Sequence, residues 1–169
     1  MAVTQQLARL SPAHLAMCRS SVEALDKLCS FALLPPSDYL DLDWAPAPLL
    51  RAFQLAQVSE PIPVALQRGL HGDVEINPAY RGCRDTVWEH PVTALEPHAV
   101  ADVAALLGRV EPEAVWAALP NDDAAALSAV GLREFGGHPK HYLHRHLASL
   151  LDFYAGAARR GLAVALWWD

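Results

Sequence analysis

The segment from His138 to His146 holds the densest group of possible metal ligands in the chain. If this segment is helical, His141 and His144 lie about 60° apart on one side of the helix, and His138 precedes them as a third imidazole. The segment contains no Asp or Glu that completes a metal site, and imidazoles at the polar start of a helix are ordinarily solvated. We therefore predict no bound metal and no other cofactor.

Cys83 is a candidate nucleophile because it lies between Arg81 and Arg84, whose positive charges lower the pKa of a thiol that they face. Covalent catalysis also needs a base and a group that orients the base, and sequence separation alone does not bring His71 or His90 to Cys83. The sequence has no glycine-rich phosphate loop, no serine nucleophile elbow and no two-histidine zinc helix. We therefore expect no catalytic residues and interpret Cys83 as a buried thiol.

A third candidate is an acidic segment bounded by prolines, in which carboxylates alternate with large apolar side chains. Its candidate partner-binding residues are Asp38, Tyr39, Asp41, Asp43 and Trp44. Carboxylates at the rim of an interface steer a basic partner, and a buried aromatic anchor slows its release. The segment is thus either an acidic patch that binds a partner or a cation, or a solvated turn before a helix, with Asp43 as the helix cap.

Composition limits the number of domains and the kinds of partner that we expect. The chain has 169 residues, 53% hydrophobic and 19% charged, which predicts a single domain over residues 1–169. A net charge of -6 and a pI near 5.7 argue against nucleic acid as a partner, because phosphate-binding surfaces concentrate Lys and Arg. Three cysteines without a disulfide or zinc framework are typical of a cytoplasmic protein, and no apolar stretch approaches the roughly 20 residues that span a membrane.

The elements that must position these side chains are clearest at the C-terminal end. Apolar residues from Leu143 to Ala158 follow one stripe of a helix, which Gly161 closes after Arg160. The run from Leu162 to Trp168 is continuously apolar, which predicts a strand covered on both faces. We interpret Trp167 and Trp168, with Trp88 and Trp116, as core residues; the alternative is that they line a ligand pocket.

Prolines and small polar residues delimit the remaining elements. We expect a strand over Ala2 to Leu7, an irregular loop over Leu70 to Cys83 and a strand over Thr86 to Trp88. Expected helices are Pro12 to Arg19, a second that Ser20 or Ser21 caps and that extends through Leu33 until Pro35, and then Leu49 to Leu55, Val64 to Gly69, Glu96 to Leu107, Glu111 to Leu119 and Asn121 to Val130. The first two helices should pack on the terminal helix, and the terminal strand should pair with one of the other two strands. The fold class is therefore α+β, a mostly helical single domain with a small sheet that includes the C-terminal strand.

Four segments carry a family resemblance. They are Tyr39-Leu40-Asp41-Leu42-Asp43, Pro63-Val64-Ala65-Leu66, Leu95 to Leu107, and Phe153-Tyr154 through Gly161-Leu162-Ala163-Val164. Their order and spacing, over nearly the whole chain, resemble those of the YfbM-like family of small bacterial proteins. The family has no established activity, so the resemblance implies a fold and no mechanism.

These observations favour a non-enzymatic role in protein binding. The partner is expected to be a basic protein that meets the acidic segment, and an immunity-type inhibitor of a toxin is one concrete form of such a role. The alternative is a small enzyme or ligand-binding protein that uses the loop from Leu70 to His90 and the histidines near it.

Overall fold

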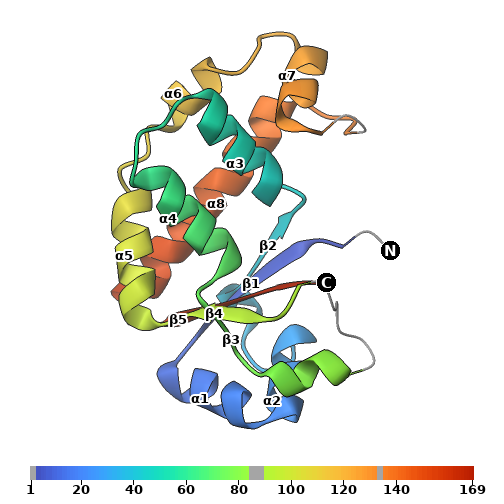
Figure 1. Cartoon of the computed structure of the whole chain (residues 1–169), viewed down its shortest axis with the longest axis vertical. Coiled ribbons are helices and arrows are strands. Elements are labelled where there is room, and N and C mark those ends of the chain that lie inside the picture. Colours follow the sequence, from blue (N-terminus) through green and yellow to red (C-terminus); the bar gives the residue numbers. More distant parts are fainter. Residues whose placement is uncertain (1–2, 84–89, 133–134) are drawn as a thin grey trace.

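The computed structural model of the chain describes residues 3–83, 90–132 and 135–169. It contains an antiparallel sheet with helices on both faces (Figure 1). The strands are β1 (Gln5–Leu10), β2 (Tyr39–Asp43), β3 (Val74–Glu75), β4 (Thr93–Leu95) and β5 (Ala163–Trp168). The helices are α1 (Pro12–Ser20), α2 (Val22–Cys29), α3 (Pro46–Leu55), α4 (Ile62–His71), α5 (Pro97–Leu107), α6 (Pro112–Ala117), α7 (Asp123–Val130) and α8 (Pro139–Arg159), with short 3-10 helices η1 (Pro36–Asp38) and η2 (Pro78–Gly82).

The C-terminal strand lies at the centre of the sheet, whose strand order is β2-β1-β5-β4-β3. β5 pairs with β1 along its whole length, from Ala163 opposite Leu10 to Trp168 opposite Gln5. On its other side it pairs with the shorter β4, and that register ends with Thr93 opposite Leu166. The last two residues of β5 therefore extend beyond β4, and no other described strand pairs with them on that side.

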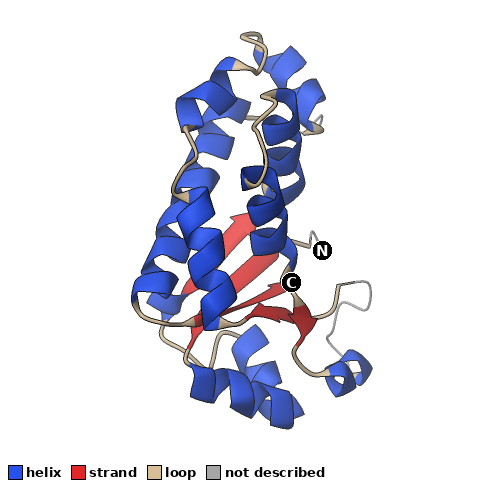
Figure 2. Ribbon diagram, turned by 60° about the vertical axis from the view of Figure 1, so that its left-hand side comes forward, coloured by secondary structure: helices blue, strands red, loops and turns tan. Residues whose placement is uncertain are grey.

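The sheet separates two apolar cores because its central strands alternate between its faces. Val164 and Leu166 of β5 join the larger core, which α3, α4, α5 and α8 cover. Ala163, Ala165 and Trp167 join the smaller core, which α1, α2 and η2 cover. Figure 2 shows most of the helices above the sheet and a smaller group below it. β5 is buried on both faces, as its continuous apolar sequence predicts.

The predicted packing of the first two helices is wrong. α1 and α2 lie on the face of the sheet opposite α8, with Leu15 and Leu28 in the same core as Leu10 and Trp167. Their sequence periodicity defines an apolar face but does not specify which side of a sheet that face covers. This packing places α2 beside the end of β5.

The caps of several helices follow the sequence closely. Ser11 and Ser21 accept hydrogen bonds from the first turns of α1 and α2, and Asp122 does so for α7. Gly161, with φ of 62°, follows α8 and turns the chain into β5. Among the described residues, no helix has both the length and the apolar character that crossing a membrane requires.

Other boundaries differ from those expected. β1 starts at Gln5, α2 ends at Cys29 well before the prolines, and residues 39–43 form the edge strand β2 instead of a loop or turn. Ala45 precedes α3, so Asp43 is not its cap. The region expected to be an irregular loop contains β3 and η2. The predicted strand over residues 86–88 lies outside the described residues, and β4 is the strand that pairs with β5 there.

Candidate functional site

Asp38, the first residue of the predicted binding segment, is buried and ion-paired. Arg160 Nη1 donates a hydrogen bond to Asp38 Oδ1 at 2.6 Å, and Arg9 Nε lies 3.2 Å from the same oxygen. The hydrogen bond from Arg160, with the charges of both guanidinium groups, holds the pKa of this carboxyl below its usual range. The negative charge of Asp38 is therefore balanced inside the fold, where it ties the start of β2 to β1 and to the end of α8.

Tyr39 is half-buried and belongs to an aromatic group beneath the sheet. Its ring lies 5.2 Å from that of Phe31 and 6.3 Å from that of Trp167, both distances being between ring centroids. Its hydroxyl accepts a hydrogen bond from the Leu34 N–H at 3.2 Å. Tyr39 thus packs against the smaller core instead of projecting from the surface.

Asp41 and Trp44 are the exposed members of the predicted binding segment, and Trp44 is 45% exposed. Asp43 is half-buried, and its Oδ2 accepts a hydrogen bond from the Tyr142 hydroxyl at 3.1 Å. The same hydroxyl accepts one from the Trp44 N–H at 3.2 Å, while Asp41 Oδ1 accepts one from the Asp43 N–H at 2.7 Å. The five predicted residues therefore do not form one exposed acidic surface.

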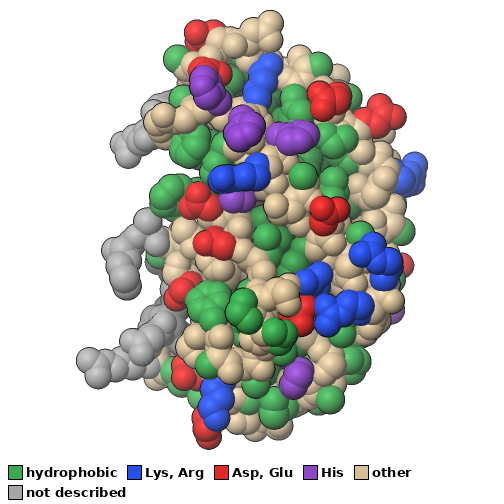
Figure 3. Space-filling model, turned by 180° about the vertical axis from the view of Figure 1, so that it is seen from behind, with side chains coloured by type: hydrophobic (Ala, Val, Ile, Leu, Met, Phe, Trp, Pro, Cys, Tyr) green, Lys and Arg blue, Asp and Glu red, His purple; other side chains and the backbone are tan. Residues whose placement is uncertain are grey.

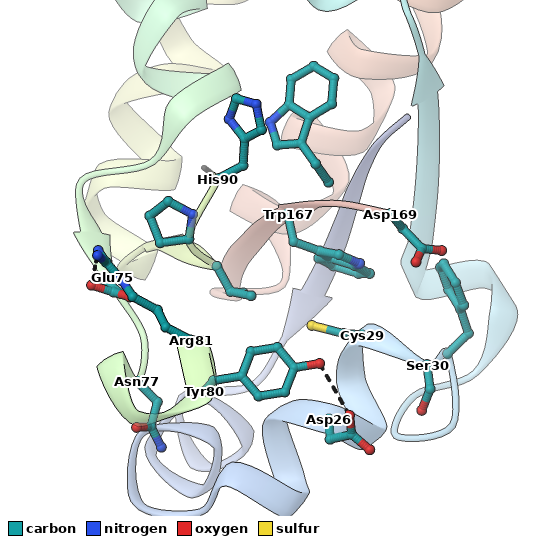
Figure 4. A pocket seen from close by; sticks show the side chains of 14 residues that line it. Asp26, Cys29, Ser30, Glu75, Asn77, Tyr80, Arg81, His90, Trp167 and Asp169 are labelled. Carbon is teal, nitrogen blue, oxygen red and sulfur yellow. Dashed lines mark hydrogen bonds and ion pairs between the residues drawn. The ribbon is translucent and has the colours of Figure 1, made fainter. Parts of the chain in front are cut away.

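A cavity of about 360 Å³ lies on the smaller-core side of the sheet, where α2, η2 and the end of β5 meet (Figure 4). We call it the tryptophan pocket. Its aromatic walls are Phe31, Tyr80, Trp167 and Trp168, and its polar lining includes Asp26, Cys29, Glu75, Arg81, His90 and Asp169. Trp167 and Trp168 form part of the wall because β4 stops short of them. The overhang of β5 beyond β4 thus contributes to the pocket.

Phe31 stands at the rim of the tryptophan pocket in an unusual backbone conformation. Its φ is 61°, a left-handed value that is uncommon for a bulky aromatic residue. The ring is 43% exposed, and its centroid lies 5.8 Å from that of Trp167. The conformation closes α2: the Phe31 N–H donates to the Leu28 carbonyl oxygen and the Ala32 N–H to the Lys27 carbonyl oxygen, the usual pattern of a left-handed helix end. The end of α2 thereby places the Phe31 ring at the rim of the tryptophan pocket.

The polar groups of the tryptophan pocket form two separate pairs. On one side, Arg81 donates two hydrogen bonds to the Glu75 carboxylate, at 2.6 and 2.8 Å. On the side formed by α2, the Tyr80 hydroxyl donates to Asp26 Oδ1 at 3.2 Å. In Figure 4 the Asp169 carboxylate borders the same side as Asp26. Among the described residues, Asp169 has no side-chain hydrogen bond or ion pair.

Two groups in the wall of the tryptophan pocket, Cys29 and Tyr80, have raised pKa values. Burial raises the pKa of the Cys29 thiol to about 12, and burial also raises the pKa of Tyr80 above its ordinary value. Both groups are therefore protonated at neutral pH. A protonated thiol is a poor nucleophile, so Cys29 and Tyr80 act as walls and hydrogen-bond donors.

A second hollow of about 240 Å³ adjoins the tryptophan pocket. The two share His90, Pro91, Trp167 and Trp168, and the second is also lined by Gln5, Leu70, His71, Thr93 and Leu166. The rings of His90 and Trp168, which line both hollows, have centroids 5.1 Å apart. The end of β5 therefore has a hollow on each face of the sheet, separated by a pair of aromatic rings.

The predicted histidine cluster is divided among different partners. His138 Nδ1 lies 2.5 Å from Asp123 Oδ2, and His144 Nδ1 accepts a hydrogen bond from Trp116 Nε1 at 3.0 Å. Figure 3 shows histidines near the upper end of the rear face, where α7 and the start of α8 lie. His146 is buried, and its pKa is lowered by burial and by Arg145. Within residues 3–83, 90–132 and 135–169, no group of three or more histidine, cysteine or acidic side chains is placed to hold a metal ion.

The other candidate nucleophile and base lie apart from the tryptophan pocket lining. Cys83 follows η2 and packs, half-buried, against the smaller core, while Arg84 is outside the described residues. His71 Nδ1 lies 2.8 Å from the Gln67 carbonyl oxygen. Asp73 is paired with Arg68 at 2.7 and 2.5 Å, so it does not orient His71.

Sequence reasoning identified part of this pocket and missed the rest. The loop from Leu70 to His90 and the two terminal tryptophans were candidates for a ligand site, and they supply much of its lining. Asp26, Cys29 and Phe31 were not candidates. The only signal for them in the sequence is the aromatic residue Phe31 just after the end of α2. It indicates a pocket wall only once α2 is known to lie beside β5.

Comparison with known proteins bears on the fold. Neither a scan against protein-family models nor a search of curated proteins finds a match. A search of solved structures finds the crystal structure of YfbM from Escherichia coli, described as a protein of unknown function. It aligns with a TM-score of 0.61 and 13% sequence identity, covering 98% of this chain and 99% of that one. The resemblance seen in the sequence is thus confirmed at the level of structure: this chain has the fold of YfbM.

Proposed function

We propose that this chain binds a small organic molecule in the tryptophan pocket. The observation that supports the proposal most is the cavity itself, whose volume of about 360 Å³ falls in the range of roughly 300–1,000 Å³ typical of small-molecule sites. Its composition fits as well, since such sites combine apolar and aromatic walls with a few polar groups. The exposed ring of Phe31 in the lining is a third supporting observation.

Binding is favoured over covalent catalysis because of the protonation states in the wall. A cysteine protease or similar enzyme needs a thiolate and a base close to it. The thiol of Cys29, with a pKa of about 12, supplies almost no thiolate at neutral pH. The neighbouring Tyr80 hydroxyl donates its hydrogen bond to Asp26, so it is not placed as a base either.

A fragment screen observed by NMR tests the proposal. The chain has five tryptophans, and the indole N–H signals of Trp167 and Trp168 should shift when a fragment enters the tryptophan pocket. The signals of Trp44 and Trp116, which do not line it, should stay in place. No shift of the two pocket signals at millimolar fragment concentrations would contradict the proposal.

A matched pair of variants locates the site. Phe31→Gly removes the rim ring and suits the left-handed backbone at that position, so fragment binding should weaken severalfold while the protein stays folded. Trp44→Ala removes an aromatic side chain of nearly equal exposure, 45% against 43%, that does not line the pocket. Its affinity for fragments should equal that of the wild type.

The second candidate function is the binding of a partner protein through β2. It is favoured by the position of β2 at the edge of the sheet, where no other described strand pairs with its outer side, and by the exposed Trp44 beside it. An edge strand and an exposed aromatic anchor are features that partner proteins use. An immunity-type inhibitor of a toxin is one form of this role, with Asp41 available to steer a basic partner.

The kinetics of a partner complex test this second candidate. Asp41→Asn should slow association and flatten its dependence on salt, because rim charges act mainly on the encounter of the two proteins. Trp44→Ala should chiefly speed dissociation. If neither variant changes either rate, the partner does not bind at β2.

A further inference from the structure

The charges around the tryptophan pocket are unbalanced. Among the described residues, its lining contains three carboxylates, those of Asp26, Glu75 and Asp169, and one guanidinium, that of Arg81. Arg81 forms a two-point hydrogen-bonded pair with Glu75, so these two charges neutralise each other. No described Lys or Arg is ion-paired with Asp26 or Asp169.

The two unbalanced carboxylates lie on the same side of the pocket. Figure 4 shows Asp26 on α2 and Asp169 at the end of β5 on this side, while the Arg81–Glu75 pair occupies the other. Asp26 accepts one hydrogen bond, from Tyr80, which leaves its second oxygen available to a ligand. A ligand group on this side would therefore meet hydrogen-bond acceptors and negative charge.

Aromatic rings surround the same space. Trp167 and Tyr80 lie around it in Figure 4, and Phe31, which also lines the pocket, has its ring centroid 5.8 Å from that of Trp167. The faces of aromatic rings carry partial negative charge and attract cations within about 6 Å. Rings and carboxylates thus favour the same kind of ligand.

We infer that the ligand of the tryptophan pocket is a small organic cation, an amine carried on an apolar or aromatic body. The inference rests on the proposed function and names its ligand class. The ammonium group would donate hydrogen bonds to Asp26 and Asp169, and the body would lie against the rings of Trp167 and Phe31. An anionic ligand of the same size would meet two like charges, since the one guanidinium of the described lining is held by Glu75.

Three probes of similar size and different charge test the inference. They are 2-phenylethylamine, 2-phenylethanol and 3-phenylpropionate, each titrated at pH 7 and low salt, with binding followed through the indole signals of Trp167 and Trp168. The amine should bind at least tenfold more tightly than the alcohol and the acid. Its affinity should also fall as salt rises, because screening weakens attraction between partly exposed charges.

Charge-removing variants identify the groups responsible. Asp26→Asn keeps the acceptor for the Tyr80 hydroxyl and Asp169→Asn disturbs no described side-chain bond, so both should fold. Each should weaken 2-phenylethylamine binding by roughly threefold to tenfold and leave 2-phenylethanol unaffected. Asp152→Asn is the matched control: it removes one charge from an exposed position of α8 outside the pocket, and should change neither affinity.

The possible failures are distinguishable. If the alcohol or the acid shifts the Trp167 and Trp168 signals as strongly as the amine, the charge inference is wrong and the ligand-binding proposal stands. Amine binding that is equal in Asp26→Asn, Asp169→Asn and the wild type would also overturn it. If no amine binds, the inference fails, and the fragment screen decides separately whether the pocket binds ligands at all.

Discussion

Arg160 and Asp38 are 122 positions apart in the chain and form an ion pair with Nη1 and Oδ1 2.6 Å apart. The pair joins the residue after α8 to the residue before β2. Arg9 of β1 completes the arrangement, 3.2 Å from the same oxygen and with its guanidinium carbon 4.9 Å from the centroid of the Phe153 ring. One buried carboxylate thus connects two strands and the longest helix.

Asp38→Asn should destabilise the protein by about 2 kcal/mol, the usual magnitude for a hydrogen bond to a charged group. The substitution keeps the size of the side chain but leaves Arg9, which is mostly buried, without its counter-ion. Urea unfolding at pH 7 measures the effect. Asp152→Asn, on the surface of α8, should stay within about 0.5 kcal/mol of the wild type. Equal stability of both variants would mean that the ion pair contributes nothing.

The contribution of Asp38 should depend on pH in a defined direction. Its pKa in the folded protein lies below the unfolded value of about 3.9, so its stabilising effect is complete above that value. The effect is lost as the pH falls through the folded-state pKa. The difference in unfolding free energy between wild type and Asp38→Asn should therefore be constant from pH 5 to 8 and shrink below about pH 4. A difference that persists unchanged at pH 2 would contradict this cause.

Tyr154→Phe should cost about 1–3 kcal/mol, because it leaves a buried carbonyl without its donor. The Tyr154 hydroxyl is fully buried and donates to the Gly69 carbonyl oxygen at 2.7 Å, joining α8 to α4. Tyr39→Phe is the comparison: its hydroxyl accepts a hydrogen bond in a half-buried position that water can reach, so its loss should cost less. Thermal and urea unfolding of both variants measure the difference.

Local sequence signals predicted much of the helical structure. Ser11, Asp122 and Gly161 act at helix ends through bonds or backbone angles that depend on nearby residues alone, and the sequence places all three correctly. The burial of β5 on both faces also follows from its composition, since seven consecutive apolar residues leave no polar face. The helices and the sheet confirm the predicted α+β class, and the match to the YfbM structure confirms the predicted fold.

The site required information that no local pattern contains. Trp167 and Trp168 are adjacent and equally apolar, yet Trp167 is a core residue and Trp168 is half-exposed in the wall of both hollows. Both residues extend beyond β4, and their side chains point to opposite faces of the sheet. Trp167 points to the smaller core that α1, α2 and η2 cover, so the difference depends on which helices cover each face. In the same way, Asp38 and Asp41 look alike in the sequence, and only the distant Arg160 makes one of them structural.

Trp44→Ala should lower the free energy of unfolding by about 2 kcal/mol and leave the protein folded. Its side chain is 45% exposed, so somewhat more than half of the ring is buried, on the order of 100 Å² at about 25 cal/mol per Å², and the backbone N–H that bonds to Tyr142 remains. Urea unfolding is the measurement. A loss of about this size would make Trp44→Ala a sound probe of partner binding, whereas a loss of about 4 kcal/mol or more would identify Trp44 as a core packing residue.

Cys29 should react slowly with iodoacetamide in the folded protein. The thiolate is the reactive form, and with a pKa of about 12 Cys29 supplies roughly one thiolate in ten thousand at pH 8, against about a quarter for a free cysteine. The greater nucleophilicity of a more basic thiolate recovers only part of this deficit. Labelling should therefore be at least tenfold slower than in the same protein unfolded in urea, as followed by mass spectrometry of the peptide that contains Cys29. Labelling at the unfolded rate would show that Cys29 is reactive, and the tryptophan pocket would then have to be considered as a site of thiol chemistry.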